Sequence, residues 1–289
     1  MEVTKQRAGL PKFSPDKVPI ALRILPLIFA LALCAGGCVR GSGTTGAHSG
    51  PSSATGQILS TGWFRNTAQE SGLNFRWGHG GKTPLNIIET LGHGCAFLDF
   101  DQDGLMDALL VGNNRCSLFH NLGNGRFADV SHEMGLSAEG SFYGVAVGDY
   151  DNDGFPDLFI TGYGKCVLYH NMAGKRFEDV TVQAGVAARG PYDVVTAAAF
   201  VDLDGDGKLD LFAGRYIQFT PSTIHFCNYG SVRAGCGVKN YEPDVPRVYR
   251  NLGGGRFADA TKEWGLDSLQ GRWLGVAVCA ADTGSGVSL

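Results

Sequence analysis

The 289-residue sequence lacks several features that mark common functional classes. Positive charge is not in excess: 24 Lys and Arg residues stand against 28 Asp and Glu residues, and the formal net charge is −4. A basic surface for nucleic-acid binding is therefore not expected. The eight cysteines include no CxxC pair, which argues against a zinc ribbon or a thioredoxin-type site. The GxSxG and HExxH motifs of common hydrolases are also absent from the sequence.

Glycine, by contrast, is abundant. The sequence has 43 glycines, about twice the usual share of roughly 7%. They follow no G-X-Y period, so a collagen-like chain is excluded. Glycine at this density is typical of short β-strands joined by many tight turns.

The amino-terminal 37 residues have the layout of an export signal. Basic residues are spread over residues 1–23, an apolar run extends from Ile24 to Cys34, and small residues lead to Cys38. The run is shorter than the roughly 20 residues that a transmembrane helix needs. The small residues before Cys38 resemble a bacterial lipobox, although Ala35 replaces its usual leucine. We therefore expect lipidation of Cys38, with an ordinary cleaved signal as the alternative.

Residues 38–62 are rich in glycine, serine and threonine, and this composition predicts a flexible tether. A tether directly after Cys38 suits a lipoprotein held to the membrane by an amino-terminal lipid anchor. The expected location is the bacterial outer membrane or cell surface, or otherwise the periplasm or the medium.

From residue 63 to residue 289 the sequence repeats itself. The segments DFDQDGLMD, DYDNDGFPD and DLDGDGKLD begin 50 and then 53 residues apart, at Asp99, Asp149 and Asp202. Each lies between short apolar segments and is followed by LFHN, LYHN or VYRN and then by a RFAD or RFED segment. About four short strands per 50 residues match the strand number and length of one β-propeller blade. The sequence therefore predicts an all-β fold.

The three Asp-rich segments are candidate metal-binding loops. Each has Asp at positions 1, 3, 5 and 9 and Gly at position 6, where a sharp turn can form. Alternate carboxylates on a turned backbone converge on one point, and an all-oxygen ligand set suits Ca²⁺. Position 12 is never Glu, so these are not EF-hands, and the alternative is a turn that binds nothing. The candidate ligands, with the position 7 carbonyls included, are Asp99, Asp101, Asp103, Leu105 and Asp107; Asp149, Asp151, Asp153, Phe155 and Asp157; and Asp202, Asp204, Asp206, Lys208 and Asp210.

Longer segments carry a family resemblance: GVAVGDYDNDGFPDLFITGYG, LYHNMAGKRFEDVTVQAGV and VYRNLGGGRFADATKEWGL. The chain resembles FG-GAP/VCBS-repeat proteins, specifically the ASPIC/UnbV group that includes cartilage acidic protein. The resemblance implies an integrin-α-like β-propeller, seven-bladed in the family, with up to three Ca²⁺ loops here. It also implies an extracellular adhesive or carbohydrate-associated role and no established enzyme activity.

The match departs from the family in repeat number. Only about 3.5–4 repeats are present, and the carboxy-terminal ASPIC/UnbV module is missing. A fourth loop should begin near Asp282, but no further carboxylates follow it. We therefore expect an incomplete propeller and a truncated chain.

The cysteines and histidines of the repeat region have structural interpretations. Export makes a disulfide between Cys227 and Cys236 plausible, and the ASPIC/UnbV-like proteins often carry a cysteine pair in this insertion. His120, His170 and Arg250 occupy matched repeat positions, so we interpret them as structural rather than catalytic. Four other cysteines are expected to be small core residues: Cys95, Cys116, Cys166 and Cys279.

The preferred function is a calcium-binding surface protein, an adhesive module for an extracellular glycan or protein ligand, with no catalysis. One alternative is an extracytoplasmic polysaccharide-acting enzyme on a propeller scaffold, for which a unique acid–base pair in the central channel would be the sign. The other is a truncated fragment without function.

Overall fold

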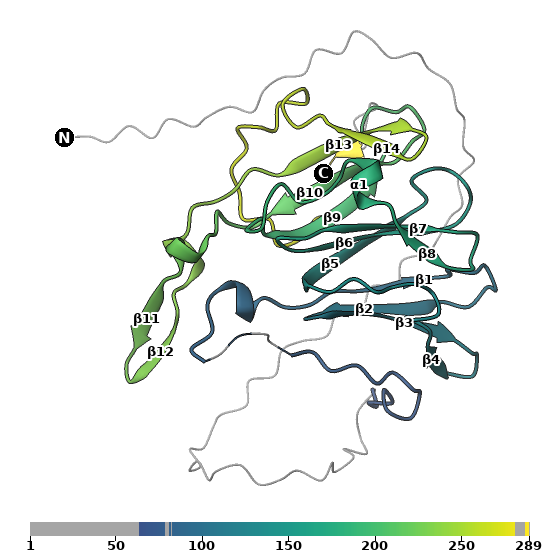
Figure 1. Cartoon of the computed structure of the whole chain (residues 1–289), viewed down its shortest axis with the longest axis horizontal. Helices are drawn as coiled ribbons and strands as arrows, with labels where there is room; N and C mark the ends of the chain where they lie inside the picture. The colour runs from purple at the N-terminus through teal and green to yellow at the C-terminus, as the bar shows by residue number, and fades with distance from the viewer. Residues whose placement is uncertain (1–63, 79–80, 82, 281–286, 289) are drawn as a thin grey trace, which may run out of the picture. The chain divides into compact units, whose positions relative to one another are not determined.

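The computed structural model describes residues 64–78, 81, 83–280 and 287–288, and its architecture is all-β (Figure 1). The export signal, Cys38, the whole tether (residues 38–62) and Asp282 lie outside these residues. Helical structure within them is limited to the four-residue α1 (Thr181–Ala184) and the 3₁₀ turns η1 (Ile88–Thr90), η2 (Pro221–Thr223) and η3 (Val238–Asn240). The predicted fold class is therefore confirmed. Among the described residues, none of the helices has the length and hydrophobicity of a membrane span.

Each repeat forms one four-stranded antiparallel sheet. The first contains β1 (Cys95–Leu98), β2 (Asp107–Gly112), β3 (Arg115–Asn121) and β4 (Phe127–Asp129). The second contains β5 (Ser141–Gly148), β6 (Asp157–Tyr163), β7 (Val167–Asn171) and β8 (Phe177–Asp179). The third contains β9 (Val195–Val201), β10 (Asp210–Arg215), β13 (Arg247–Gly253) and β14 (Arg256–Asp259).

Two small antiparallel pairs complete the described structure. The hairpin of β11 (Phe226–Tyr229) and β12 (Val232–Gly235) lies in the insertion between β10 and β13. A disulfide joins Cys227 to Cys236 at its base, with a Cα–Cα distance of 4.9 Å. The second pair is β15 (Cys279–Ala280) with β16 (Val287–Ser288).

The apolar core lies between consecutive sheets, which Figure 1 shows one above the other. β5 packs against β1 and β2 on one side and against β9 on the other. Leu109 of the first sheet and Leu158 of the second share one core cluster, and Leu168 and Leu211 share the next. All four side chains are fully buried. Burial of such alternating apolar faces is the main force that stacks the sheets.

Polar backbone contacts repeat at the same places between sheets. Asn113 forms a bridge to Ser141, and Tyr163 forms the equivalent bridge to Val194. The turns that end the first and second repeats also pack on the last strand of the next sheet. For example, the Phe177 N–H donates to the Met134 carbonyl at 2.8 Å. Neighbouring sheets are thus held by both apolar burial and directional bonds.

The outward side of the first sheet is not covered by another sheet within the described residues. Phe97 of β1 is 67% exposed, whereas Val147 and Phe200, at the same repeat position, pack against core clusters. Cys95 on the same strand is exposed, so the prediction that it is a core residue is wrong. Cys279 is exposed as well, whereas Cys116 and Cys166 are buried as predicted.

Candidate metal centre

The three Asp loops connect the first two strands of each sheet. The first loop (residues 99–107) joins β1 to β2, the second (149–157) joins β5 to β6, and the third (202–210) joins β9 to β10. Position 6 has a left-handed backbone in each, with φ of 85° at Gly104, 95° at Gly154 and 84° at Gly207. Glycine adopts this conformation without the steric cost that other residues meet. The sequence-based account of the sharp turn therefore holds at this position.

Position 4 is a second left-handed position, which the sequence analysis missed. Gln102, Asn152 and Gly205 have φ of 63°, 60° and 75°. Only Gly205 adopts this conformation freely, although Asn tolerates it better than most residues do. Two left-handed residues in one short loop bend the backbone tightly enough to bring alternate side chains together.

The Asp carboxylate at position 1 closes each loop by accepting backbone N–H groups of positions 5 and 6. The Asp99 carboxylate accepts the Asp103 N–H at 3.1 Å on Oδ1 and the Gly104 N–H at 2.9 Å on Oδ2. Asp149 and Asp202 make the same pair of bonds in their loops. The position 5 carboxylate in turn accepts the N–H of position 7, as Asp103 does from Leu105 at 2.8 Å. The loops are therefore shaped by their own carboxylates.

Position 9 begins the second strand of each sheet and is buried. Asp107 is fully shielded from solvent and accepts the Asn121 N–H at 2.7 Å and the Phe100 N–H at 3.2 Å. Burial raises the pKa of Asp107 and Asp210, and it raises the pKa of Asp157 to about 7. Burial disfavours the charged form of a carboxylate, and a nearby cation favours it again. These buried carboxylates therefore suit a site that holds a cation.

The carboxylates of each loop converge. In every group below, one ligand atom from each of three residues lies within 4.8 Å of the other two. Positions 1, 3 and 9 meet in the first two loops, and positions 1, 3 and 5 meet in the third, where Asp210 is not part of the group. The groups are Asp99, Asp101 and Asp107; Asp149, Asp151 and Asp157; and Asp202, Asp204 and Asp206. Such an oxygen set fits a hard divalent cation such as Ca²⁺.

A histidine joins each of the first two carboxylate groups. His120 Nδ1 lies 3.2 Å from Asp107 Oδ1 and 3.7 Å from Asp101 Oδ2. His170 Nδ1 lies 3.2 Å from Asp157 Oδ1 and 3.3 Å from Asp151 Oδ2. Each histidine thus touches two candidate ligands, which the sequence analysis did not predict. In the sequence both histidines lie 13 residues after position 9, and this constant offset could have indicated the contact.

The third loop already contains positive charge. Arg250 stands at the histidine position and its Nε lies 3.1 Å from Asp204 Oδ2. Lys208 forms an ion pair with Asp206, and this hydrogen bond lowers the pKa of the Asp206 carboxyl. Both carboxylates belong to the third group. The third loop therefore offers less uncompensated negative charge to a metal ion than the first two loops do.

Neighbouring loops are connected by hydrogen bonds. The Gln102 amide of the first loop donates to the Gly154 carbonyl of the second at 2.6 Å, and the Asn152 amide donates to the Gly207 carbonyl of the third at 3.3 Å. Asn171, on β7, donates to the Phe100 carbonyl in the first loop at 2.9 Å. Asn251 makes the equivalent bond to Tyr150 at 2.7 Å. The three loops therefore form one connected row.

Comparison with known proteins identifies the repeat. The model of the FG-GAP-like repeat matches residues 99–160 and 149–213, so the chain contains FG-GAP-like repeats. These matches cover the three Asp loops and the strands from β2 to β9. No curated protein sequence matches the chain.

One similar solved structure is that of a lectin from Agrocybe aegerita, described as showing specific recognition of non-reducing terminal N-acetylglucosamine. The two chains are 21% identical over 57% of this chain, with a TM-score of 0.31. The match spans 36% of the lectin chain.

Proposed function

We propose that this protein is an exported, calcium-stabilised binding protein of the cell surface, without catalysis. The single observation that carries the proposal is the convergence of three carboxylates within 4.8 Å at each of three repeat-equivalent loops. Three equivalent clusters on one row of loops suit a structural role, because a catalytic site needs a unique arrangement. The FG-GAP-like repeats support a propeller-type binding module.

In this proposal the carboxylates at positions 1, 3, 5 and 9 hold the ion, together with the carbonyl oxygen at position 7. The bound ion would supply positive charge that offsets repulsion among these carboxylates. Ca²⁺ is favoured over Mg²⁺, since it accepts six to eight oxygens in irregular arrangements, whereas Mg²⁺ demands near-octahedral geometry. We propose tighter binding in the first two loops than in the third, where Lys208 and Arg250 already neutralise two carboxylates.

The proposed setting is extracytoplasmic. Lipidation of Cys38 would anchor the chain to a membrane, and the tether that follows would let the repeats reach an external glycan or protein ligand. The disulfide between Cys227 and Cys236 supports this setting, because such bonds persist in oxidising compartments.

Thermal unfolding with and without calcium tests the metal part of this proposal. Extracellular calcium modules bind with dissociation constants of about 10⁻⁴–10⁻³ M, so about 10 mM Ca²⁺ gives up to a hundredfold excess. Two occupied loops would then add about 5 kcal/mol of stability. For a domain of this size, EGTA should lower the melting temperature by about 10–20 °C relative to Ca²⁺.

A double variant of the second loop, Asp151→Ala with Asp153→Ala, should lose about half of this calcium-dependent shift. The matched control replaces two exposed acidic residues outside the loops, Glu133→Ala with Asp267→Ala, and should keep the full shift. Identical melting curves in EGTA and in Ca²⁺, together with no heat of binding by calorimetry, would contradict the calcium proposal.

A further inference from the structure

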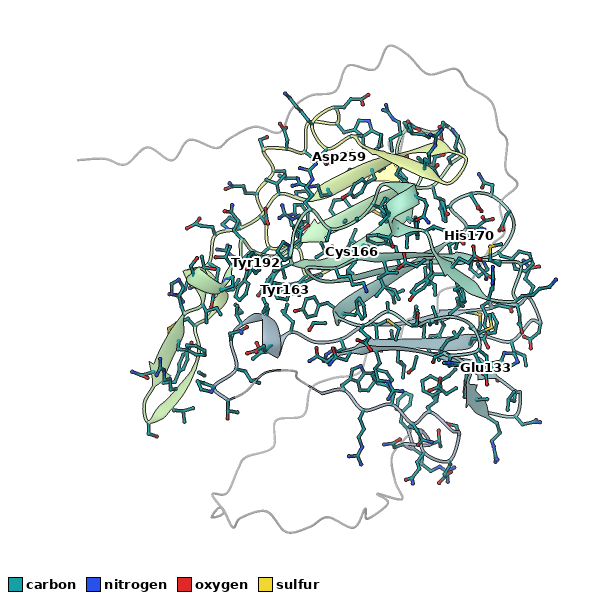
Figure 2. The ribbon with its side chains drawn as sticks, in the orientation of Figure 1. Glu133, Tyr163, Cys166, His170, Tyr192 and Asp259 are labelled. Atoms are coloured by element: carbon teal, nitrogen blue, oxygen red, sulfur yellow. A yellow bond between two sulfur atoms is a disulfide. The ribbon has the colours of Figure 1, made fainter. Side chains whose placement is uncertain are left out.

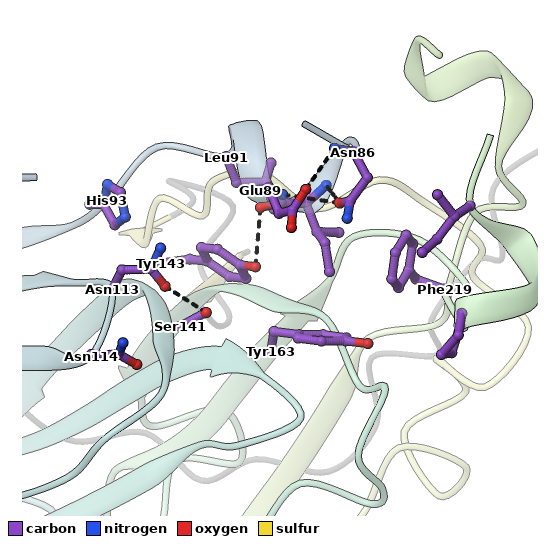
Figure 3. Close-up of a pocket in the computed structure, with 13 residues that line it drawn as sticks. Asn86, Glu89, Leu91, His93, Asn113, Asn114, Ser141, Tyr143, Tyr163 and Phe219 are labelled. Atoms are coloured by element: carbon purple, nitrogen blue, oxygen red, sulfur yellow. Dashed lines mark hydrogen bonds between the residues drawn. The ribbon is translucent and has the colours of Figure 1, made fainter. Parts of the chain in front are cut away.

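A second candidate site lies at the end of the sheets away from the Asp loops. Figure 2 shows His170, which contacts the second loop, at one end of the sheets, and Tyr163 and Tyr192 toward the other. Near Tyr163 is a cavity of about 300 Å³, shown in Figure 3. Its walls come from four parts of the chain: the segment around η1, the β2–β3 turn, the adjoining ends of β5 and β6, and the segment that follows β10.

One side of the cavity is aromatic. The rings of Tyr163 and Phe219 meet edge to face, with centroids 5.7 Å apart and planes at 83°. Tyr143 lines the cavity beside them, and its hydroxyl donates to the Ile88 carbonyl at 3.3 Å (Figure 3). The cavity therefore has flat apolar surfaces that are fixed by packing and by a hydrogen bond.

The facing wall is polar and held in place by its own hydrogen bonds. The Glu89 carboxylate accepts the Asn86 N–H at 2.8 Å, and the Asn86 side chain accepts the N–H groups of Ile88 and Glu89. The carboxylate lies directly over Gly81, where a Cβ atom would stand only 2.2 Å from it. The absence of a side chain at Gly81 thus provides the space that the Glu89 carboxylate occupies.

The β2–β3 turn supplies further polar groups. Ser141 donates to the Asn113 side-chain oxygen at 2.7 Å, and the Asn113 amide donates to the Gly78 carbonyl at 3.1 Å. Asn114, also in the wall, is exposed, and its side chain makes no hydrogen bond within the described residues. The Asn114 amide is therefore available to a ligand as both donor and acceptor.

The charge of the lining excludes some ligand classes. The described residues that line it include no Lys or Arg, so a phosphate or carboxylate ligand would meet no cation among them. Burial lowers the pKa of His93, which favours the neutral imidazole. Among the described lining residues, Glu89 is the single carboxylate. The described lining thus combines aromatic surface with uncharged hydrogen-bonding groups and one carboxylate, and this combination disfavours anionic ligands.

We propose that this cavity binds one neutral sugar ring, as the recognition site for the glycan ligand considered above. This inference rests on the proposed binding function and gives it a location. A pyranose has apolar C–H faces that pack on aromatic rings and a rim of hydroxyls that both donate and accept hydrogen bonds. The cavity offers both kinds of surface, and its volume is at the lower end of the range of about 300–1,000 Å³ for ligand pockets.

Saturation-transfer NMR on the purified full-length chain tests this proposal. The probes are the methyl glycosides of glucose, galactose, mannose and N-acetylglucosamine, with choline and inorganic phosphate as competing ligand classes. A ligand of this size is expected to bind with a dissociation constant on the order of 1 mM. Saturation should reach at least one glycoside and should exceed that of choline and phosphate.

Two variants locate the binding. Tyr163→Ala removes one aromatic surface and should weaken glycoside binding about tenfold or more. Asn114→Gly removes only the side-chain amide, since glycine adopts the left-handed backbone of this position (φ 58°) without cost. This variant should weaken glycoside binding several-fold without affecting stability. It therefore shows whether the glycoside binds in the cavity even if Tyr163→Ala fails to fold. The control, Tyr229→Ala on the β11–β12 hairpin, should bind as the unaltered chain does.

The proposal is overturned if no glycoside shows saturation transfer, if choline or phosphate binds better, or if both cavity variants bind the glycoside normally. These measurements need no calcium, so their failure is distinct from failure of the calcium titration. A chain that binds glycosides but not calcium would retain this cavity as its functional site.

Discussion

Single residues determine how much positive charge each Asp loop already contains. The first two loops have an uncharged residue at position 7 and a histidine 13 residues after position 9, whereas the third has Lys208 and Arg250 at the equivalent places. A lysine ammonium beside a cation site opposes the entry of a second cation. The three loops therefore occupy equivalent positions in their repeats but differ in the positive charge beside their carboxylates.

Replacing this lysine should strengthen the third site. Lys208→Leu puts the residue of the first loop into the third and keeps the position 7 carbonyl. Removing one nearby positive charge should tighten calcium binding by this loop up to about tenfold. Isothermal titration calorimetry would detect the change in the weakest binding step. Lys262→Leu, which removes an exposed lysine outside the loops, should leave all steps unchanged, and an unaltered weakest step in Lys208→Leu would contradict this electrostatic account.

At the scale of elements, the sheets are joined by a repeated asparagine. Asn171 is fully buried, and its amide donates to Phe100 of the preceding sheet and to Pro156 of its own. Asn251 does the same with Tyr150 and Leu209. The first copy, Asn121, bonds to Met106 at an exposed contact, and no preceding sheet lies beside it within the described residues.

This difference predicts unequal effects of one substitution. Asn171→Ala leaves two carbonyl oxygens without their donor, at about 1–3 kcal/mol for each buried polar group. The expected loss of unfolding free energy is about 2–5 kcal/mol, measured by urea denaturation at constant m-value. Asn121→Ala is the matched control, and its expected loss is below about 1 kcal/mol. Equal losses of unfolding free energy in the two variants would show that the hydrogen bond between sheets does not cause the loss.

At the scale of the whole molecule, the stacked sheets have an apolar surface that no other described segment covers. Phe97 is 67% exposed on the first sheet, while the same position is packed in the second and third. Sheets that lack a neighbour tend to associate through their open faces and edges. We therefore expect the chain to self-associate in solution.

Phe97→Ser should reduce this association by making the uncovered face polar. Light scattering at tens of micromolar protein, roughly the range where such contacts matter, should show a lower mean mass for the variant than for the unaltered chain. Phe64→Ser is the control, because Phe64 is 96% exposed but lies outside the sheets, and it should not change the mass. A monomeric unaltered chain would refute the expectation.

Much of the fold and of the loops could be predicted from the sequence because their determinants are local. Alternating apolar residues and glycine turns recur in each repeat, so strand number and order follow from one copy. The Asp spacing and the position 6 glycine act within nine residues, so the sharp turn at position 6 follows as well, whereas the left-handed backbone at position 4 was missed. The export signal and Cys38 also depend on local pattern, but they lie outside the described residues and remain predictions.

The rest depends on contacts between segments distant in the sequence, which only the tertiary structure determines. His120 meets Asp107 because β2 and β3 pair in a particular register, and Arg250 reaches Asp204 although the insertion between β10 and β13 separates them in the sequence. Cys95 is exposed because no sheet covers β1 within the described residues, although its strand is as apolar as the others. The aromatic cavity unites residues around 86–93, 113–114, 141–143, 163 and 219–224, and no repeat or spacing in the sequence marks them as neighbours.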